Sequence, residues 1–222
     1  MDNQFNEQTY SKEMPTIRVE ETRIKFILDG IPDAGLKILD LGCWDGSYAQ
    51  RYKKTTNMVY GIESSVSSAR RAETKGIIVQ QGDYMEKEFF AGEKFDIVVA
   101  GEIIEHVFDT DVFLEKIKNN LKSKGRIIIT TPNVASLPRR MLMLMGVNPL
   151  LENRNIPKVS VGHIRYFTFS DMYTLLKDHN CTIIRSASDV LNLNNTGTLF
   201  DTHIPKLFKT LGKTILIEAE SN

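Results

Sequence analysis

The sequence predicts an α/β protein with a seven-stranded, mostly parallel sheet, helices on both faces and an antiparallel last strand. Three observations support this fold class: short runs rich in β-branched residues recur along the chain, segments with helical spacing separate them, and a turn with two glycines follows the first run. Such alternation gives parallel strands joined by right-handed crossovers, with a binding crevice at the carboxyl ends of the strands. We therefore expect functional residues directly after the strands.

The expected strands are short and rich in valine and isoleucine. They comprise residues 37–41, 58–62, 77–80, 95–100, 126–130, 182–188 and 214–219, of which the last fits an antiparallel hairpin at the sheet edge. Helical spacing marks the segments around them, at residues 16–31, 64–75, 110–121 and 170–179. The alternation breaks between Pro132 and Arg165, where prolines and a Met-rich run indicate an insertion.

Composition limits the class of partner. The 222 residues fit one domain, and lysine plus arginine equals aspartate plus glutamate at 28 each, so no global field favours nucleic acid or an anionic membrane. Cys43 and Cys181 lie far apart and form no metal-binding spacing, so we expect reduced thiols in a cytoplasmic protein. The polar N-terminus lacks a secretory signal, and no apolar run approaches the ~20 residues that cross a bilayer. The oligomeric state stays open.

The turn after the first strand carries the sharpest signal. Residues 38–48 read Ile-Leu-Asp-Leu-Gly-Cys-Trp-Asp-Gly-Ser-Tyr, an apolar strand that leads into a turn and then a helix. Gly42 and Gly46 allow the backbone to pass close to a ligand, and the amides at the helix N-terminus can bind a carboxylate. Trp44 and Asp45 fill the middle of the turn, so the Gly-x-Gly-x-x-Gly fingerprint of dinucleotide-binding proteins is absent.

Polar residues follow the next two strands. Glu63 comes directly after the second strand, where a carboxylate can accept hydrogen bonds from both hydroxyls of a ribose. After the third strand, Asp83 can accept a hydrogen bond from an adenine amino group, and Tyr84 can lie against the ring. Together these residues predict a nucleoside pocket.

In this order the motifs resemble those of the class I S-adenosylmethionine-dependent methyltransferases, whose sheet is Rossmann-like. The likeness is good over residues 37–131, and the segments GEIIEHV at 101–107 and GHIRYFT at 162–168 are similar to the ubiquinone-biosynthesis-type O-methyltransferases. It implies a single methyltransferase domain over residues 1–222, divided into an N-terminal helix (16–31), a cofactor-binding core (37–131), a lid insertion (132–168) and a C-terminal part of the sheet (169–222). Trp44 departs from the family, which commonly has a smaller residue there.

The resemblance also implies a cofactor and the residues that bind it. S-adenosylmethionine would be bound and S-adenosylhomocysteine released, with Gly42 and Gly46 beside the methionine part, Glu63 at the ribose, and Asp83 with Tyr84 at the adenine. The full set of residues expected at the cofactor is Asp40, Gly42, Cys43, Gly46, Glu63, Ser64, Asp83, Tyr84 and Glu102.

A group of acidic residues and a histidine follows the fourth strand. Glu102, Glu105 and His106 are spaced i, i+3 and i+4, so one helical turn would direct all three to one side. In one hypothesis His106 is a general base that takes the proton of an acceptor hydroxyl. In a second, these residues and His163 bind a divalent cation, similar to related small-RNA and quinone O-methyltransferases. In a third, Glu102 and His106 only hold the loop. We take His106 as the catalytic residue and assign no metal.

The Met-rich run Leu137 to Met145 places flexible thioether side chains around Arg139 and Arg140. One interpretation is an ordinary buried helix of the lid. Another is a hydrophobic cover for an apolar acceptor, with peripheral membrane contact through residues 137–150.

The sequence thus predicts in-line O-methylation of a small, partly apolar, hydroxyl-bearing acceptor, with no nucleic-acid partner. Two other classes stay open: a non-catalytic, cofactor-binding regulatory module, and an NAD-dependent oxidoreductase that lacks the usual glycine fingerprint.

Overall fold

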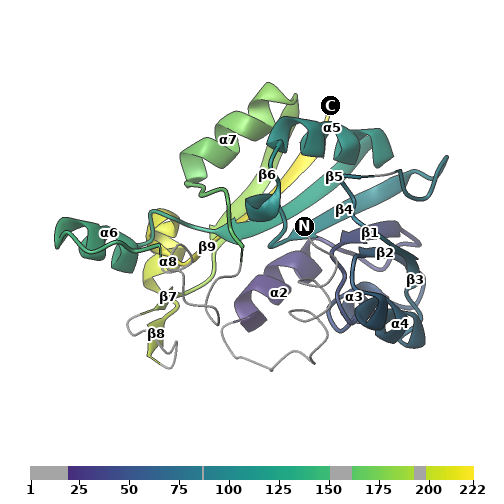
Figure 1. Ribbon diagram of the computed structural model, residues 1–222, viewed down its shortest axis with the longest axis horizontal. Helices are drawn as coiled ribbons and strands as arrows, with labels where there is room; N and C mark the ends of the chain where they lie inside the picture. The colour runs from purple at the N-terminus through teal and green to yellow at the C-terminus, as the bar shows by residue number, and fades with distance from the viewer. Residues whose placement is uncertain (1–19, 87, 151–161, 193–198) are drawn as a thin grey trace.

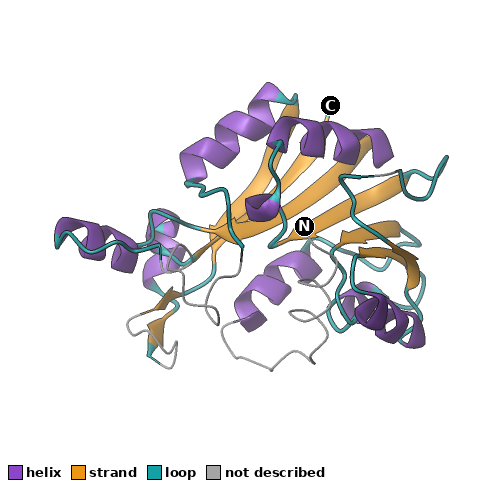
Figure 2. Ribbon diagram, viewed as in Figure 1, coloured by secondary structure: helices purple, strands orange, loops and turns teal. Residues whose placement is uncertain are grey.

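The computed structural model describes residues 20–86, 88–150, 162–192 and 199–222, in which helices cover both faces of one large sheet (Figures 1 and 2). The expectations for residues 16–19 and for residues 151–161 of the insertion lie outside the described residues. Within the described ranges, no helix is long and apolar enough to span a bilayer.

Seven strands form the large sheet in the order β3-β2-β1-β4-β5-β9-β6. Their bounds are β1 Lys37–Leu41, β2 Met58–Glu63, β3 Ile78–Gln81, β4 Phe95–Gly101, β5 Leu121–Pro132, β6 Cys181–Ser188 and β9 Thr214–Ser221. Neighbours from β3 to β5 are parallel, whereas β9 is antiparallel to both β5 and β6. The predicted fold class is confirmed, and the antiparallel pair lies at one edge with β6 outermost.

The protein has two hydrophobic cores, one on each face of the sheet, and alternate residues along a strand belong to opposite cores. On β4, Val98 and Ala100 belong to the core that includes α5 (Thr110–Asn120) and α7 (Phe169–Asp178). Ile97 and Val99 belong to the opposite core, which includes α2 (Glu20–Asp29), α3 (Ala49–Tyr52) and α4 (Val66–Thr74). In Figure 1 these two groups of helices lie on opposite sides of the sheet. Burial on both faces explains why the strands are nearly continuous apolar runs.

Side-chain caps fix where the covering helices begin. The Ser65 hydroxyl accepts a hydrogen bond from Ser68 N, and the Asp109 carboxylate accepts one from Val112 N. Thr168 and Asp171 form a reciprocal capping box at the start of α7. The helices therefore begin within two residues of the predicted positions.

Several elements differ from the expectation because their causes are not local. β5 begins at Leu121 rather than at residue 126, where the register with β4 shifts between Phe95 and Ile97. The insertion contains helix α6 (Leu137–Leu144). A two-stranded sheet of β7 (Leu191–Asn192) and β8 (Phe200–Asp201), the short helix α8 (Ile204–Leu207) and the turn η3 (Lys209–Leu211) were not predicted, since they are too short for a periodic signal.

A buried ion-pair group joins α2 to the strands β5, β6 and β9. The Glu218 carboxylate on β9 is buried and binds the guanidinium groups of Arg126 on β5 and Arg185 on β6. Arg185 also donates to the carbonyl of Phe26, and its guanidinium lies 4.0 Å from the centroid of the Phe26 ring. Through this group, residues from the last strands hold the N-terminal helix against the sheet.

We expect Glu218→Gln to lower the free energy of unfolding by about 2 kcal/mol, because it leaves two partly buried guanidinium groups without their counter-charge. Urea unfolding followed by circular dichroism measures this loss. Glu220→Gln, two residues along the same strand on a less buried side chain, is the matched control and should change stability by less than about 0.5 kcal/mol. Equal losses in the two variants would contradict the role assigned to Glu218.

Candidate functional site

A cavity of about 670 Å³ opens at the carboxyl ends of the parallel strands. Its lining comes from the turn after β1, the end of β2, the loop at 82–86, the segment from 101 to 109, and α2. The strand order reverses between β1 and β4, and open sheets of this kind bind ligands at that point. The cavity therefore lies where the sequence predicts a site.

The turn after β1 has a left-handed backbone at three positions. Gly42, Trp44 and Gly46 have φ values of 65°, 47° and 76°. A Cβ atom on Gly42 would collide with the Ile103 side chain, and one on Gly46 would lie 2.8 Å from the Ala72 Cα atom of α4. Gly42 and Trp44 line the cavity, whereas Gly46 is not among its lining residues. The structure thus explains Gly46 by close packing on α4 rather than by direct ligand contact.

Glu63 connects this turn to the end of β2. Its Oε2 atom accepts a hydrogen bond from Trp44 N at 2.9 Å, and its Oε1 atom accepts one from Ser65 N at 2.8 Å. Ser64 lies beside it, with its hydroxyl 3.4 Å from Oε1. Burial raises the pKa of Glu63, although these amide hydrogen bonds act in the opposite direction. Oε1 also accepts a hydrogen bond from the Ser64 hydroxyl, so of the about four acceptor positions of a carboxylate one remains, on Oε2.

Asp40 and Cys43 are two buried residues close to the turn after β1. Both line the cavity and are almost fully buried. Burial, with a smaller contribution from the charge of Glu63, raises the pKa of Asp40 to about 8. Burial also raises the pKa of the Cys43 thiol, so this side chain is a packing group and not a nucleophile.

Asp83 and Tyr84 follow β3 but face different surroundings. The half-buried Asp83 lines the cavity and accepts a hydrogen bond from Met85 N at 2.8 Å. The Tyr84 ring packs edge-on to Phe113, with 5.8 Å between centroids, and its hydroxyl bonds to Asn120. Tyr84 therefore borders the cavity while most of its ring belongs to the core under α5.

Glu102 does not share a helical turn with Glu105 and His106, contrary to the expectation. It lies before the short turn η1 (Ile104–His106), and its φ of 56° is left-handed and not helical. Its Oε1 atom accepts a hydrogen bond from Thr130 at 3.0 Å and lies 3.4 Å from the Arg23 guanidinium. Glu102 lines the cavity and pairs with Arg23 of α2, and it does not belong to the group formed by Glu105, His106 and His163.

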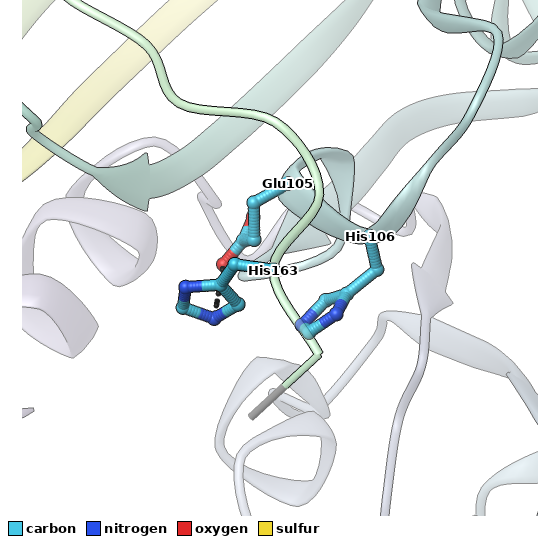
Figure 3. A group of neighbouring side chains, drawn as sticks. All are labelled: Glu105, His106 and His163. Atoms are coloured by element: carbon cyan, nitrogen blue, oxygen red, sulfur yellow. Dashed lines mark ion pairs between the residues drawn. The ribbon is translucent and has the colours of Figure 1, made fainter. Parts of the chain in front are cut away.

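Glu105, His106 and His163 come together from two distant segments (Figure 3). The Glu105 carbonyl accepts hydrogen bonds from Ile164 N and Arg165 N, which fixes the segment that carries His163. One ligand atom from each of the three side chains lies within 4.8 Å of the others. Glu105 Oε2 accepts from Thr131, whereas the buried Oε1 atom lies 3.9 Å from His163 Nε2 and has no hydrogen-bond partner. Burial raises the pKa of Glu105 well above its usual value.

The hydrogen-bond partner of His106 determines which of its ring nitrogens carries the proton. Its Nδ1 atom lies 3.2 Å from the Gly162 carbonyl, which can only accept, so Nδ1 carries the proton. Burial and the neighbouring His163 lower the pKa of His106, which favours the neutral ring. Nε2 is then left with a free lone pair, as a general base requires. This ring lines the cavity.

The sequence did not indicate the contribution of α2. Arg23, Ile24 and Ile27 form one wall of the cavity, and Arg23 is its only arginine among the described lining residues. Seven carboxyl groups are among the lining residues, those of Asp40, Asp45, Glu63, Asp83, Glu86, Glu102 and Asp109. The pKa of Asp40 is about 8 and Asp45 pairs with Lys75, which leaves five carboxyl groups against the one arginine. The cavity therefore favours a cationic ligand and disfavours a pyrophosphate. A helical pattern alone cannot show which of its polar residues face a cavity.

Helix α6 is neither of the two possibilities that the Met-rich run left open, a buried helix of the lid or a cover for this cavity. None of its residues is buried. None of its residues lines the cavity, and the described part of the insertion contributes only His163. In Figure 1, α6 projects from one end of the molecule. Its side chains instead border a separate shallow groove with Val134 and Ala135.

Comparisons with known proteins agree on one family. A family model described as a methyltransferase domain matches residues 16–186. The ubiquinone biosynthesis O-methyltransferase of Chelativorans sp. is 34% identical over 117 residues, which cover 46% of this chain and 42% of the relative. That of Bartonella bacilliformis is 31% identical over 160 residues, which cover 69% of this chain and 62% of the relative. The chain thus spans less than two thirds of the length of these two relatives.

Solved structures share the fold at low sequence identity. An N-methyltransferase from Bradyrhizobium japonicum, solved in complex with S-adenosyl-L-homocysteine, is similar with a TM-score of 0.66 and 13% identity, covering 99% of both chains. This likeness shows that the fold of the sheet and its helices is shared over the whole chain.

We expect Asp40→Asn to stabilise the protein at pH 8 by on the order of 2 kcal/mol and to have less effect at lower pH. In the unfolded chain this carboxyl ionises near its ordinary pKa, whereas the folded protein keeps the proton up to about pH 8. Between these values the folded state binds more protons, so the free energy of unfolding of the parent falls as pH rises. Urea unfolding at several pH values measures the difference.

Asp83→Asn is the control, because its carboxyl lies in the same cavity but is only half-buried. It should leave the pH profile of stability close to that of the parent. A profile for Asp40→Asn that runs parallel to the parent would contradict the assigned role of Asp40.

Proposed function

The chain belongs to the methyltransferase domain family, and from this premise we propose that it O-methylates a small, partly apolar, hydroxyl-bearing acceptor with S-adenosylmethionine as the methyl donor. The observation that carries this proposal is the acidic cavity at the β1–β4 crevice, with its carboxyl groups and a neutral histidine. The named O-methyltransferases among the relatives support oxygen as the acceptor atom.

The cavity fits this donor better than a dinucleotide. The sulfonium of S-adenosylmethionine is a cation, and carboxyl groups outnumber the single arginine in the described lining. Glu63 retains an acceptor position on Oε2 and can exchange the long bond from the Ser64 hydroxyl for a second ribose hydroxyl, and Asp83 lies at the neighbouring strand end. We assign the methionine part to Asp40, Gly42, Cys43 and Glu102, the nucleoside to Glu63, Ser64, Asp83 and the edge of Tyr84, and to Gly46 an indirect role through α4.

The donor supplies a methyl group that is transferred to the acceptor oxygen as the sulfur–carbon bond breaks, leaving S-adenosylhomocysteine. In this proposal His106 Nε2 accepts the hydroxyl proton, because Nδ1 is held by the Gly162 carbonyl. A base of this kind contributes about 10²–10⁴-fold, whereas alignment of two bound molecules contributes ~7–11 kcal/mol. Loss of His106 therefore lowers the rate without abolishing it.

One observation favours a second candidate role for this site, the binding of a divalent cation. The buried Oε1 atom of Glu105 accepts no hydrogen bond. Leaving a buried carboxylate oxygen without a hydrogen bond is costly, and a cation held with His163 and His106 would satisfy it. Glu105, His106 and His163 are the residues that would hold a divalent cation, and Glu102 would stay with Arg23. Such an ion would supply a Lewis acid that acidifies the acceptor hydroxyl.

We also propose a cytoplasmic location. It is supported by Cys43 and Cys181, which are both free and buried, as expected of a protein in a reducing compartment.

We expect Glu63→Gln to weaken binding of S-adenosylmethionine by about 10–100-fold, since it removes charge-assisted hydrogen bonds to the ribose. Isothermal titration calorimetry of the purified protein measures the loss. Glu86→Gln, an exposed residue at the rim of the same cavity, is the matched control and should bind like the parent. A parent protein that binds NAD in preference to S-adenosylmethionine would overturn the proposed function.

The cation is tested separately. If Glu105 binds a divalent cation, magnesium or manganese raises the melting temperature of the parent, and a chelator slows methyl transfer. The Glu105→Ala variant should respond neither to the added metal ion nor to the chelator. Glu86→Gln should keep both responses. A parent whose stability and activity are unchanged by ions and by the chelator excludes the cation while leaving His106 as base.

A further inference from the structure

Trp44 is the only tryptophan of the chain, and it lies in the middle of the turn after β1. Its φ of 47° is left-handed, a conformation that glycine adopts freely and that strains a bulky residue. Backbone strain of this kind gathers at ligand-binding sites, where the rest of the structure holds the strained residue in place. Here the bond from the Trp44 amide to Glu63 contributes to that hold. The position therefore suits a residue whose side chain takes part in binding.

The place of Trp44 in the cavity lies between two parts of the proposed donor. Its amide donates to Oε2 of Glu63, the residue assigned to the ribose, at 2.9 Å. Gly42 and Cys43, which directly precede it, are assigned to the methionine part, and all four residues line the cavity. In S-adenosylmethionine the sulfonium sulfur joins the ribose to the methionine chain. A side chain between these two subsites is therefore within reach of the sulfonium.

Burial is consistent with a side chain that borders the cavity. Trp44 is half-buried, whereas Cys43 before it and Asp45 after it are each only 4% exposed. The backbone of the turn is thus enclosed while part of Trp44 stays accessible at the cavity.

The other aromatic residues of the lining are less suited to contact the sulfonium. In the described lining they are Tyr48, Tyr52, Tyr84, Phe108 and Phe113. Tyr52, Tyr84 and Phe113 pack in the hydrophobic cores. The rings of Tyr48 and Phe108 already face cations, since the guanidinium groups of Arg23 and Arg165 lie 6.0 Å and 5.6 Å from their centroids.

We propose that the indole of Trp44 contacts the sulfonium of S-adenosylmethionine and makes the site prefer this cation to the neutral S-adenosylhomocysteine. This inference rests on the proposed function. The face of an indole ring is electron-rich, and tryptophan attracts a cation more strongly than the other aromatic residues do. When the methyl group is transferred, the sulfur keeps the electron pair of the broken bond and becomes a neutral thioether. The attraction to the indole is therefore present with the donor and lost with the product.

Isothermal titration calorimetry with the two ligands tests the proposal. Trp44→Gly removes the indole and suits the left-handed backbone, so the fold should be kept, as circular dichroism verifies. It should weaken binding of S-adenosylmethionine about 3–30-fold and binding of S-adenosylhomocysteine clearly less. A change in the turn itself affects both ligands alike, so the ratio of the two affinities isolates the contact with the charge.

Two further variants sharpen this comparison. Trp44→Phe keeps an aromatic face and should retain most of the preference for the cation. Phe208→Leu removes an exposed aromatic ring outside the cavity lining and should bind both ligands like the parent.

The single tryptophan also reports binding directly. All tryptophan emission of the parent comes from Trp44, so S-adenosylmethionine should change this emission with the affinity that calorimetry gives. Equal weakening of the two ligands in Trp44→Gly overturns the inference, as does calorimetric binding of S-adenosylmethionine that leaves the emission unchanged. In both cases the parent still binds the donor, and the proposed function stands. A parent that binds neither ligand overturns the proposed function and this inference with it.

Discussion

The Glu63 carboxylate is the interaction on which the geometry of the cavity depends. It accepts hydrogen bonds from Trp44 N after β1 and from Ser65 N after β2, so it fixes the ends of two neighbouring strands relative to each other. Trp44 has a positive φ, a conformation disfavoured for a bulky residue, and the bond from its amide helps to hold it. The Ser65 hydroxyl in turn caps α4, against which Gly46 packs. One buried carboxylate thus sets the turn, the helix behind it and the polar rim of the cavity.

The opposite wall of the cavity depends on residues from the other end of the chain. Glu218 and Arg185, on the last two strands of the sheet, hold the Phe26 end of α2. Three residues earlier in the same helix, Arg23 pairs with Glu102 after β4. The antiparallel pair at the sheet edge therefore contributes to the site without lining it. This connection gives a physical reason for the N-terminal helix and the C-terminal strand to be needed together.

The elements that the sequence predicts well are those with local causes. β1 has the predicted bounds because the apolar residues Ile38, Leu39 and Leu41 lie between a turn and Gly42. The helix starts follow from capping by Ser65 and Asp109. The clustering of Glu63, Asp83 and His106 follows from parallel topology alone. The predictions that were wrong concern residues whose positions depend on contacts with distant parts of the chain. The positive φ of Glu102 breaks the i, i+3, i+4 spacing, and the Tyr84 ring is drawn into a core whose partners, Phe113 and Asn120, lie on α5. No pattern around these residues carries that information.

The net charge of the chain is a second example of a sequence property that does not show where residues lie in the fold. A sum of zero argues correctly that the molecule has no overall field, but the fold separates charges that the sum cancels. Carboxyl groups from four strand ends converge on one cavity, while Arg140 of α6 contacts the carbonyl of Thr210, 70 residues further along the chain, outside that cavity. Since charges farther apart than a Debye length of about 8 Å are largely screened at physiological salt, each region acts on its own surroundings. A neutral chain can in this way gather carboxyl groups around one cavity while its basic residues lie elsewhere.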